Sequence, residues 1–204
     1  MGPKRVSFGI HKALLCHVSS YFKAALTGNF KEASERTVTL WDEKPEVFMR
    51  FNAWLYTNVI ELEKDPLKPH WAHLMDLSVF AEKRGIPSLP NSVIDAMITI
   101  KSKVESLPPA SRIEDVWEKT SETSGLHPFL VDFYVHIGRE GTLKKMLKYV
   151  DGFSEILVEV ILAFHRGKED GSIVKKFDFW KKRYQYHIHE PDELPCKGPM
   201  PSMA

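Results

Sequence analysis

Two short segments with the two-residue alternation of a β-strand stand among helical patterns in the first hundred residues, and this mixture constrains the fold most. Residues 6–10 (VSFGI) and 37–41 (TVTLW) alternate apolar with small or polar side chains, as half-buried strands do. Around them, apolar residues recur at the spacing of amphipathic helices. The sequence therefore predicts an α/β (α+β) first half, in which a cluster of helices accompanies a small sheet.

The helix expected to start at Pro45 has the clearest pattern, because its apolar residues fall on one face. That face consists of Val47, Phe48, Phe51, Trp54 and Leu55. Another helix is expected over 71–84, ended by Gly85 as helix C-termini commonly are. A third is expected over 91–104.

Pro108 and Pro109 break the helical pattern and mark a boundary between two halves of the chain. Residues 1–106 are predicted to form the first domain, and 110–186 an all-α extension. Its apolar stripes lie in 126–137, 143–150, 156–164 and 172–186. Residues 187–204 are polar and proline-rich, so a disordered tail is expected there.

The composition is that of an ordinary globular protein and favours no charged partner. A formal net charge of +1 removes any whole-chain argument for binding nucleic acid or an acidic membrane. Cys16 and Cys196 cannot build a disulfide framework, and no secretory signal or membrane-length apolar stretch is visible. We therefore expect a cytoplasmic or nuclear location, with neither nucleic acid nor membrane as partner.

Basic and aromatic residues interleave in the helix expected over 172–186, a combination also found in nucleic-acid-binding segments. Trp180 and Tyr184 fall on one stripe and the lysines mostly flank it. This arrangement is typical of a packing helix whose lysine stems cover its apolar edges.

Five segments of the first half resemble the BTB/POZ family, in the family's order. They are FGIHKALL at 8–15, SSYFKAAL at 19–26, FKEASE at 30–35 followed by VTL, PEVF at 45–48 followed by WLYT, and AEKRGIPSL at 81–89. The second half is similar to helical extensions that follow fungal BTB domains. The resemblance implies a first domain that lacks the family's first strand, as in an N-terminally truncated member. Asn58 stands where the family has glycine after Tyr-Thr, and asparagine tolerates the left-handed conformation.

The resemblance implies a protein-interaction module and not an enzyme. Such domains serve as substrate adaptors that dock onto the cullin of a ubiquitin ligase, and Phe30, Glu32 and Tyr56 fall on the docking positions. An aromatic anchor beside a carboxylate is a combination typical of a binding hot spot. In the competing interpretation Phe30 and Tyr56 pack in the domain's own core and Glu32 is solvated. The alternative function is an assembly or homo-oligomerisation domain of a transcription- or scaffold-type protein without a ligase role.

No catalytic, cofactor or metal site is predicted. In the context of the family, His11 is interpreted as a structural residue that hydrogen-bonds backbone near the first helix. Cys16 and His17 are adjacent and point in different directions on a helix, so Cys16 is interpreted as a small buried residue. His187 and His189 have no third ligand nearby and are interpreted as exposed polar residues.

Overall fold

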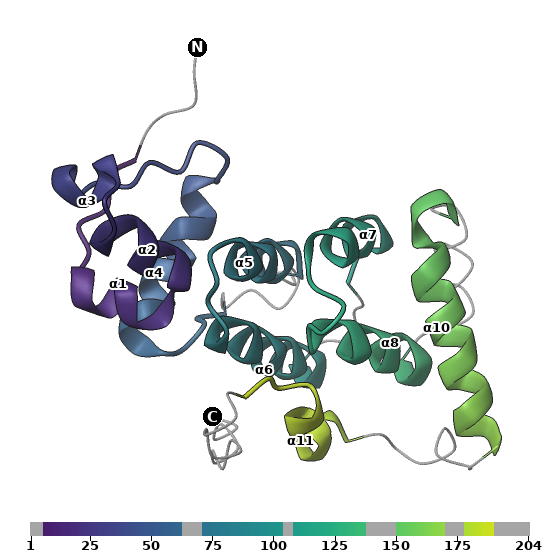
Figure 1. The fold of residues 1–204 in the computed structure, drawn as a ribbon. Helices are drawn as coiled ribbons and strands as arrows, with labels where there is room; N and C mark the ends of the chain where they lie inside the picture. Colours follow the sequence, from purple (N-terminus) through teal and green to yellow (C-terminus); the bar gives the residue numbers. More distant parts are fainter. Residues whose placement is uncertain (1–5, 63–70, 104–107, 138–149, 170–177, 190–204) are drawn as a thin grey trace.

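Helices make up the regular structure in the part of the chain that the computed structural model describes, which is residues 6–62, 71–103, 108–137, 150–169 and 178–189. In chain order these are α1 (Lys12–Val18), α2 (Ser20–Thr27), α3 (Lys31–Glu35), α4 (Pro45–Thr57), α5 (Trp71–Lys83), α6 (Ser88–Lys103), α7 (Ala110–Lys119), α8 (Leu126–Ile137), α10 (Val150–Glu169), α11 (Phe179–Lys182) and a 3₁₀ turn (Arg183–Gln185). Figure 1 shows α1 to α4 at one end of the molecule, α5 and α6 in the middle, and α10 at the other end.

The N-terminal cluster, α1 to α4, takes its helix starts from local sequence. Ser19 ends α1 and caps α2, because its hydroxyl oxygen accepts a hydrogen bond of 3.1 Å from the Phe22 amide. α4 begins at Pro45, where the missing N–H would have had no helical partner anyway. The predicted inner face of α4 is confirmed. Its buried residues are Val47, Phe51, Trp54 and Leu55, with Phe48 packed against them.

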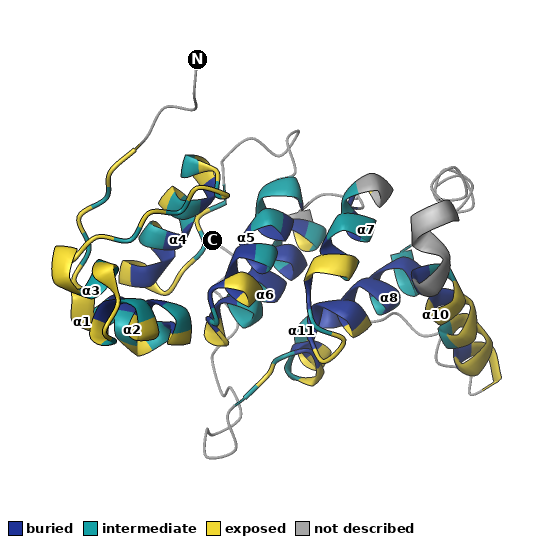
Figure 2. Ribbon diagram, turned by 45° about the horizontal axis from the view of Figure 1, so that its top comes forward, coloured by how far each residue is buried: buried dark blue, intermediate teal, exposed yellow. Residues whose placement is uncertain are grey.

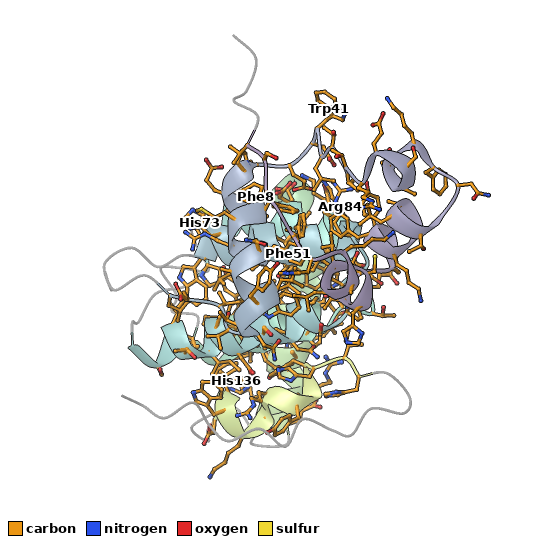
Figure 3. All side chains as sticks on the ribbon, turned by 90° about the vertical axis from the view of Figure 1, so that its left-hand side faces the viewer. Phe8, Trp41, Phe51, His73, Arg84 and His136 are labelled. Atoms are coloured by element: carbon orange, nitrogen blue, oxygen red, sulfur yellow. The ribbon has the colours of Figure 1, made fainter. Side chains whose placement is uncertain are left out.

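Phe51 lies at the centre of an aromatic core that joins α4 to α2 and α5. Its side chain is 0% exposed, and its ring centroid lies 5.0 Å from that of Phe80 and 6.3 Å from that of Phe22. Figure 3, which views the molecule from this end, shows Phe51 inside the cluster and Trp41 projecting from its rim. The core of the N-terminal cluster thus extends to α5.

The small sheet predicted from residues 6–10 and 37–41 is wrong, since the described residues contain no β-strand. Neither segment has regular secondary structure, although alternate side chains do turn inward; Phe8, for example, contacts Phe48 with ring centroids 4.9 Å apart. A sheet also needs a ladder of backbone hydrogen bonds, and within the described ranges none joins these segments to each other. The described fold is therefore a helical cluster and not α/β.

The turn between α5 and α6 holds the start of α2. Gly85 has φ 55°, in the left-handed region that glycine adopts without a Cβ penalty. Its carbonyl accepts a 3.1 Å hydrogen bond from the Ser20 amide, and the Arg84 carbonyl accepts one of 2.5 Å from the Ser19 hydroxyl. The predicted helix end at Gly85 is confirmed, and this end fixes the neighbouring helix as well.

The helices after α6 share one core with the N-terminal cluster. Trp71 of α5 is buried against Phe133 of α8, with ring centroids 5.6 Å apart. Asp76 of α5 accepts hydrogen bonds from Lys44, at 3.2 Å, and from Arg112 of α7. The buried apolar residues of both halves form one cluster, so the core continues across the boundary predicted at Pro108 and Pro109.

A short C-terminal segment, residues 178–189, packs on α8 and α6. Phe179 and Tyr186 are buried, and the Phe129 ring of α8 contacts both, at centroid distances of 5.8 Å and 5.3 Å. The Asn91 side chain exchanges hydrogen bonds of 2.8 Å and 2.9 Å with the backbone of Ile188. The segment therefore completes the core beside α8.

The prediction of one helix over 172–186 is only partly confirmed in its described part. α11 ends at Lys182 and a 3₁₀ turn follows, while Trp180 and Tyr184, predicted to face inward, are only half-buried. Contacts with α8 select which residues of this segment turn inward, and such contacts override local propensity.

Some other predictions fall outside the described residues or are corrected by them. Of the helix expected over 143–150, only Val150 is described, and it begins α10. Of the tail expected over 187–204, residues 190–204 lie outside the described residues, whereas 187–189 belong to the packed C-terminal segment and are not a disordered tail. In α10, Ile161 and Phe164 share the predicted apolar stripe of Ile156, but both are exposed. None of the described helices is long and apolar enough to cross a membrane.

Tyr134 of α8 leads to a prediction for alkaline pH. Its buried hydroxyl donates a 2.6 Å hydrogen bond to the Pro108 carbonyl, and burial raises the pKa of Tyr134 far above its ordinary value of 10.0. A raised folded-state pKa means that the stabilisation is complete below about pH 10 and is lost above it, because the unfolded chain then releases a proton that the folded chain keeps. We expect the free energy of unfolding, from denaturation at several pH values, to fall less steeply above about pH 10 in Tyr134→Phe. Equal slopes in the two proteins would contradict the prediction.

Candidate partner-binding surface

The three predicted contact residues lie on two elements of the N-terminal cluster. Phe30 immediately precedes α3, and its side chain is 61% exposed. Glu32 lies in the first turn of α3 and is partly exposed. Tyr56 lies in the last turn of α4 and is 49% exposed. Phe30 and Tyr56 are thus available to a partner and are not core residues.

Tyr56 is held in place by His11, which is 45 residues away in sequence. The tyrosine hydroxyl oxygen accepts a 3.2 Å hydrogen bond from the His11 backbone amide, and it lies 2.9 Å from His11 Nδ1. Because the oxygen accepts from the amide, its hydrogen can be donated to an unprotonated Nδ1. The predicted structural role of His11 is confirmed, but the partner of its ring is a tyrosine hydroxyl and not the backbone.

The backbone just after Tyr56 turns in a left-handed conformation. Asn58 has φ 55°, and its amide donates a 2.7 Å hydrogen bond to the Trp54 carbonyl, which ends α4. Asparagine is among the residues that adopt this conformation at modest cost. The expectation that Asn58 serves in place of glycine is therefore confirmed.

Phe30 is presented by the end of α2. A Cβ added to Gly28 would lie 2.8 Å from the Ala24 carbonyl oxygen and 3.0 Å from the Phe30 ring, so the ring packs directly on the glycine backbone. Lys12 Nζ donates a 2.6 Å hydrogen bond to the Leu26 carbonyl in the same turn. The outer face of the Phe30 ring stays exposed while its inner face is supported.

The two parts of the surface are connected through α1. His11 holds Tyr56, and the next residue, Lys12, holds the end of α2 that precedes Phe30. Within the described ranges, no hydrogen bond or ring contact joins Tyr56 directly to Phe30 or Glu32. That these residues form a single contact surface stays a prediction.

A buried cation that was not identified from the sequence, Arg84, follows α5. Arg84 Nη2 is 2.8 Å from Asp42 Oδ1 and 3.1 Å from Glu43 Oε1, and its guanidinium carbon lies 4.7 Å from the Tyr21 ring centroid. Burial raises the pKa of Glu43, against the lowering effect of Lys83 and Arg84. These contacts fasten the loop before α4 to the turn after α5. Figure 3 labels Arg84 in the view from this end of the molecule.

The residues considered for metal or nucleophilic chemistry make structural contacts instead. The described residues contain no group of three or more ligating side chains that could hold a metal ion. His187 Nε2 lies 3.3 Å from Asp95 Oδ1, and the His187 and His189 ring centroids are 6.2 Å apart. Cys16 is half-buried, with Sγ 3.8 Å from the Phe22 carbonyl oxygen, and Cys196 lies outside the described residues.

Comparison with known proteins identifies the region that carries this surface. Residues 3–97 match the family model of the BTB/POZ domain. A 57-residue stretch is 46% identical to Kelch-like ECH-associated protein 1A from Danio rerio, and it covers 28% of this chain and 10% of that protein. The match thus spans about a tenth of that relative's length. No solved structure matches the chain.

Proposed function

We propose, on the premise that residues 3–97 are a BTB/POZ domain, that this protein-interaction module acts as a substrate adaptor of a cullin-based ubiquitin ligase. The observation that carries the proposal is the outward presentation of Phe30 and Tyr56, at the positions where the family resemblance puts the cullin dock. Both aromatic side chains contact backbone of the N-terminal cluster, Phe30 at Gly28 and Tyr56 at the His11 amide.

The energetics of docking follow from the exposure of these side chains. Phe30 is 61% and Tyr56 49% exposed, so a partner can bury about half of each side chain, which contributes about half of the roughly 1.5–3 kcal/mol for complete burial. A rigid anchor also binds with a smaller loss of conformational entropy than a mobile one. An aromatic pair of this kind therefore suits the centre of an interface.

Of the two acidic residues of α3, Glu32 is the one without an ion pair among the described residues. Glu35 pairs with Lys31 at 3.4 Å within the same helix, whereas among the described residues no ion pair involves Glu32. A carboxylate at the edge of an aromatic contact fixes the register of a basic side chain across the interface. Reversal of this charge should therefore weaken binding more than reversal at Glu35.

The test is a calorimetric titration of the folded chain with the N-terminal domain of a BTB-binding cullin. We expect binding in the micromolar range or tighter, weakened about 30-fold by Glu32→Lys, as for a hot-spot loss of about 2 kcal/mol. Glu35→Lys is the matched control, since it makes the same charge change three residues further along α3. Its affinity should stay within about threefold of the wild-type value.

The outcomes separate the proposal from its alternatives. An equal loss in both variants would indicate a general charge effect instead of contact at Glu32. No binding by a chain shown to be folded would overturn the ligase role, and would favour an assembly domain without one. Phe30→Ala should weaken binding without lowering the melting temperature, because this side chain is mostly outside the core.

A further inference from the structure

α10 has apolar residues on two opposite faces. On the inner face, Ile156 and Val160 are 1% and 6% exposed, and α10 packs there against α8. On the opposite face, Val158 and Ile161 are each 53% exposed and Leu162 is 46% exposed; these three residues are called the outer stripe. Figure 2 shows this exposed face of α10 at the edge of the molecule.

The outer stripe is unusual for a surface helix. Its members are spaced i, i+3 and i+4, so they lie side by side on one face, where a helix of a monomeric protein normally has polar residues. Contiguous exposed apolar residues with a polar rim mark interaction surfaces. The burial of a second face of α10 would therefore be favourable.

Charged residues flank the outer stripe in a self-complementary way. Glu159 lies three residues before Leu162 and Arg166 four residues after it, and both are exposed. Positions three before and four after a residue lie on the same side of a helix. One flank of the outer stripe thus has an acidic group towards the helix N-terminus and a basic group towards the C-terminus.

We propose that the outer stripe binds the outer stripe of a second copy of this chain, with the two α10 helices antiparallel. A two-fold axis perpendicular to both helices reverses their direction and keeps each flank on its own side of the interface. Glu159 then faces Arg166 of the second copy, and Arg166 faces its Glu159. A parallel arrangement about a two-fold axis along the helices would place each charged flank against the other flank of the second copy, so Glu159 and Arg166 would not meet.

The position of α10 allows the chain to pair through the outer stripe and still bind another partner at α3 and α4. α10 lies at the end of the molecule remote from α3 and α4, as Figure 1 shows. Pairing through the outer stripe therefore leaves Phe30 and Tyr56 of both copies exposed. The inference is independent of the cullin proposal, because neither surface uses a residue of the other.

Sedimentation equilibrium of the full chain, over a wide concentration range, tests the pairing. We expect a monomer–dimer equilibrium that Ile161→Glu weakens by at least about tenfold. Met49→Glu is the matched control, because Met49 is 54% exposed and belongs to α4; this variant should dimerise like the wild type. Both changes are at exposed positions, so the melting temperature should be retained.

A charge exchange tests the antiparallel geometry. Glu159→Arg and Arg166→Glu should each weaken the dimer, and the double variant should restore it, since opposite charges then face each other again. A chain that stays monomeric at its highest soluble concentration would overturn the proposal. A dimer that is insensitive to Ile161→Glu, or a double variant weaker than both single variants, would overturn it as well.

Discussion

Replacement of Phe51 by alanine is expected to lower the free energy of unfolding by about 3–5 kcal/mol, the range for a large buried aromatic residue. The Phe51 side chain is 0% exposed, and it stacks with Phe22 of α2 while it contacts Phe80 of α5. Removal of the ring leaves a cavity among three helices that cannot all collapse onto it. Denaturant unfolding followed by far-ultraviolet circular dichroism measures the loss.

Met49→Ala provides the control for this prediction. Met49 lies on the same helix two residues earlier and is 54% exposed, so its truncation should change stability by no more than about 0.5 kcal/mol. Similar losses in the two variants would mean that Phe51 does not occupy the core. Since the buried residues form one cluster, we expect α8 and α10 to unfold in the same transition.

The elements that could be predicted are those specified by nearby residues. α4 begins at Pro45 and buries one apolar stripe, and both features are local properties of the sequence. The left-handed residues Gly85 and Asn58 end their helices because few other residue types adopt that conformation cheaply. Such features need no knowledge of the rest of the fold.

The sheet failed as a prediction because strand pairing is not a local property. The alternation in residues 6–10 showed which side chains turn inward, as the contact of Phe8 with Phe48 illustrates. It held no information about a neighbouring backbone that would supply ladder hydrogen bonds. A segment without regular structure that packs on helices can have the same alternation as a strand, so sequence alone does not separate the two.

The candidate surface could be proposed from the sequence, but the contacts that support its residues could not be predicted. Family resemblance selected Phe30, Glu32 and Tyr56, but their exposure depends on the tertiary fold. The hydrogen bonds that hold Tyr56 come from His11, at a separation of 45 residues. Arg84 contacts its acidic partner Asp42 at a separation of 42 residues. The periodicity of helices and strands does not predict a contact over such a separation.

Gly125→Ala is expected to displace the C-terminal segment, residues 178–189, from α8 and to lower the free energy of unfolding by about 3 kcal/mol, near the top of the range for overpacking. A Cβ at Gly125 would overlap the backbone carbonyl of Tyr186. No rotamer change relieves an overlap with backbone, so the segment itself must move. The buried Tyr186 would then lose its 2.7 Å hydrogen bond to Asp132.

Denaturant unfolding together with amide hydrogen exchange in residues 178–189 tests this prediction, with Gly9→Ala as the control because a Cβ at Gly9 meets nothing within 4 Å. Unchanged stability and unchanged protection in Gly125→Ala would contradict the docking of the segment on α8. Lost protection with unchanged global stability would mean that the segment opens as a separate unit. Loss of both would make it part of the cooperative core, and the contacts of the Phe129 ring with both Phe179 and Tyr186 favour that outcome.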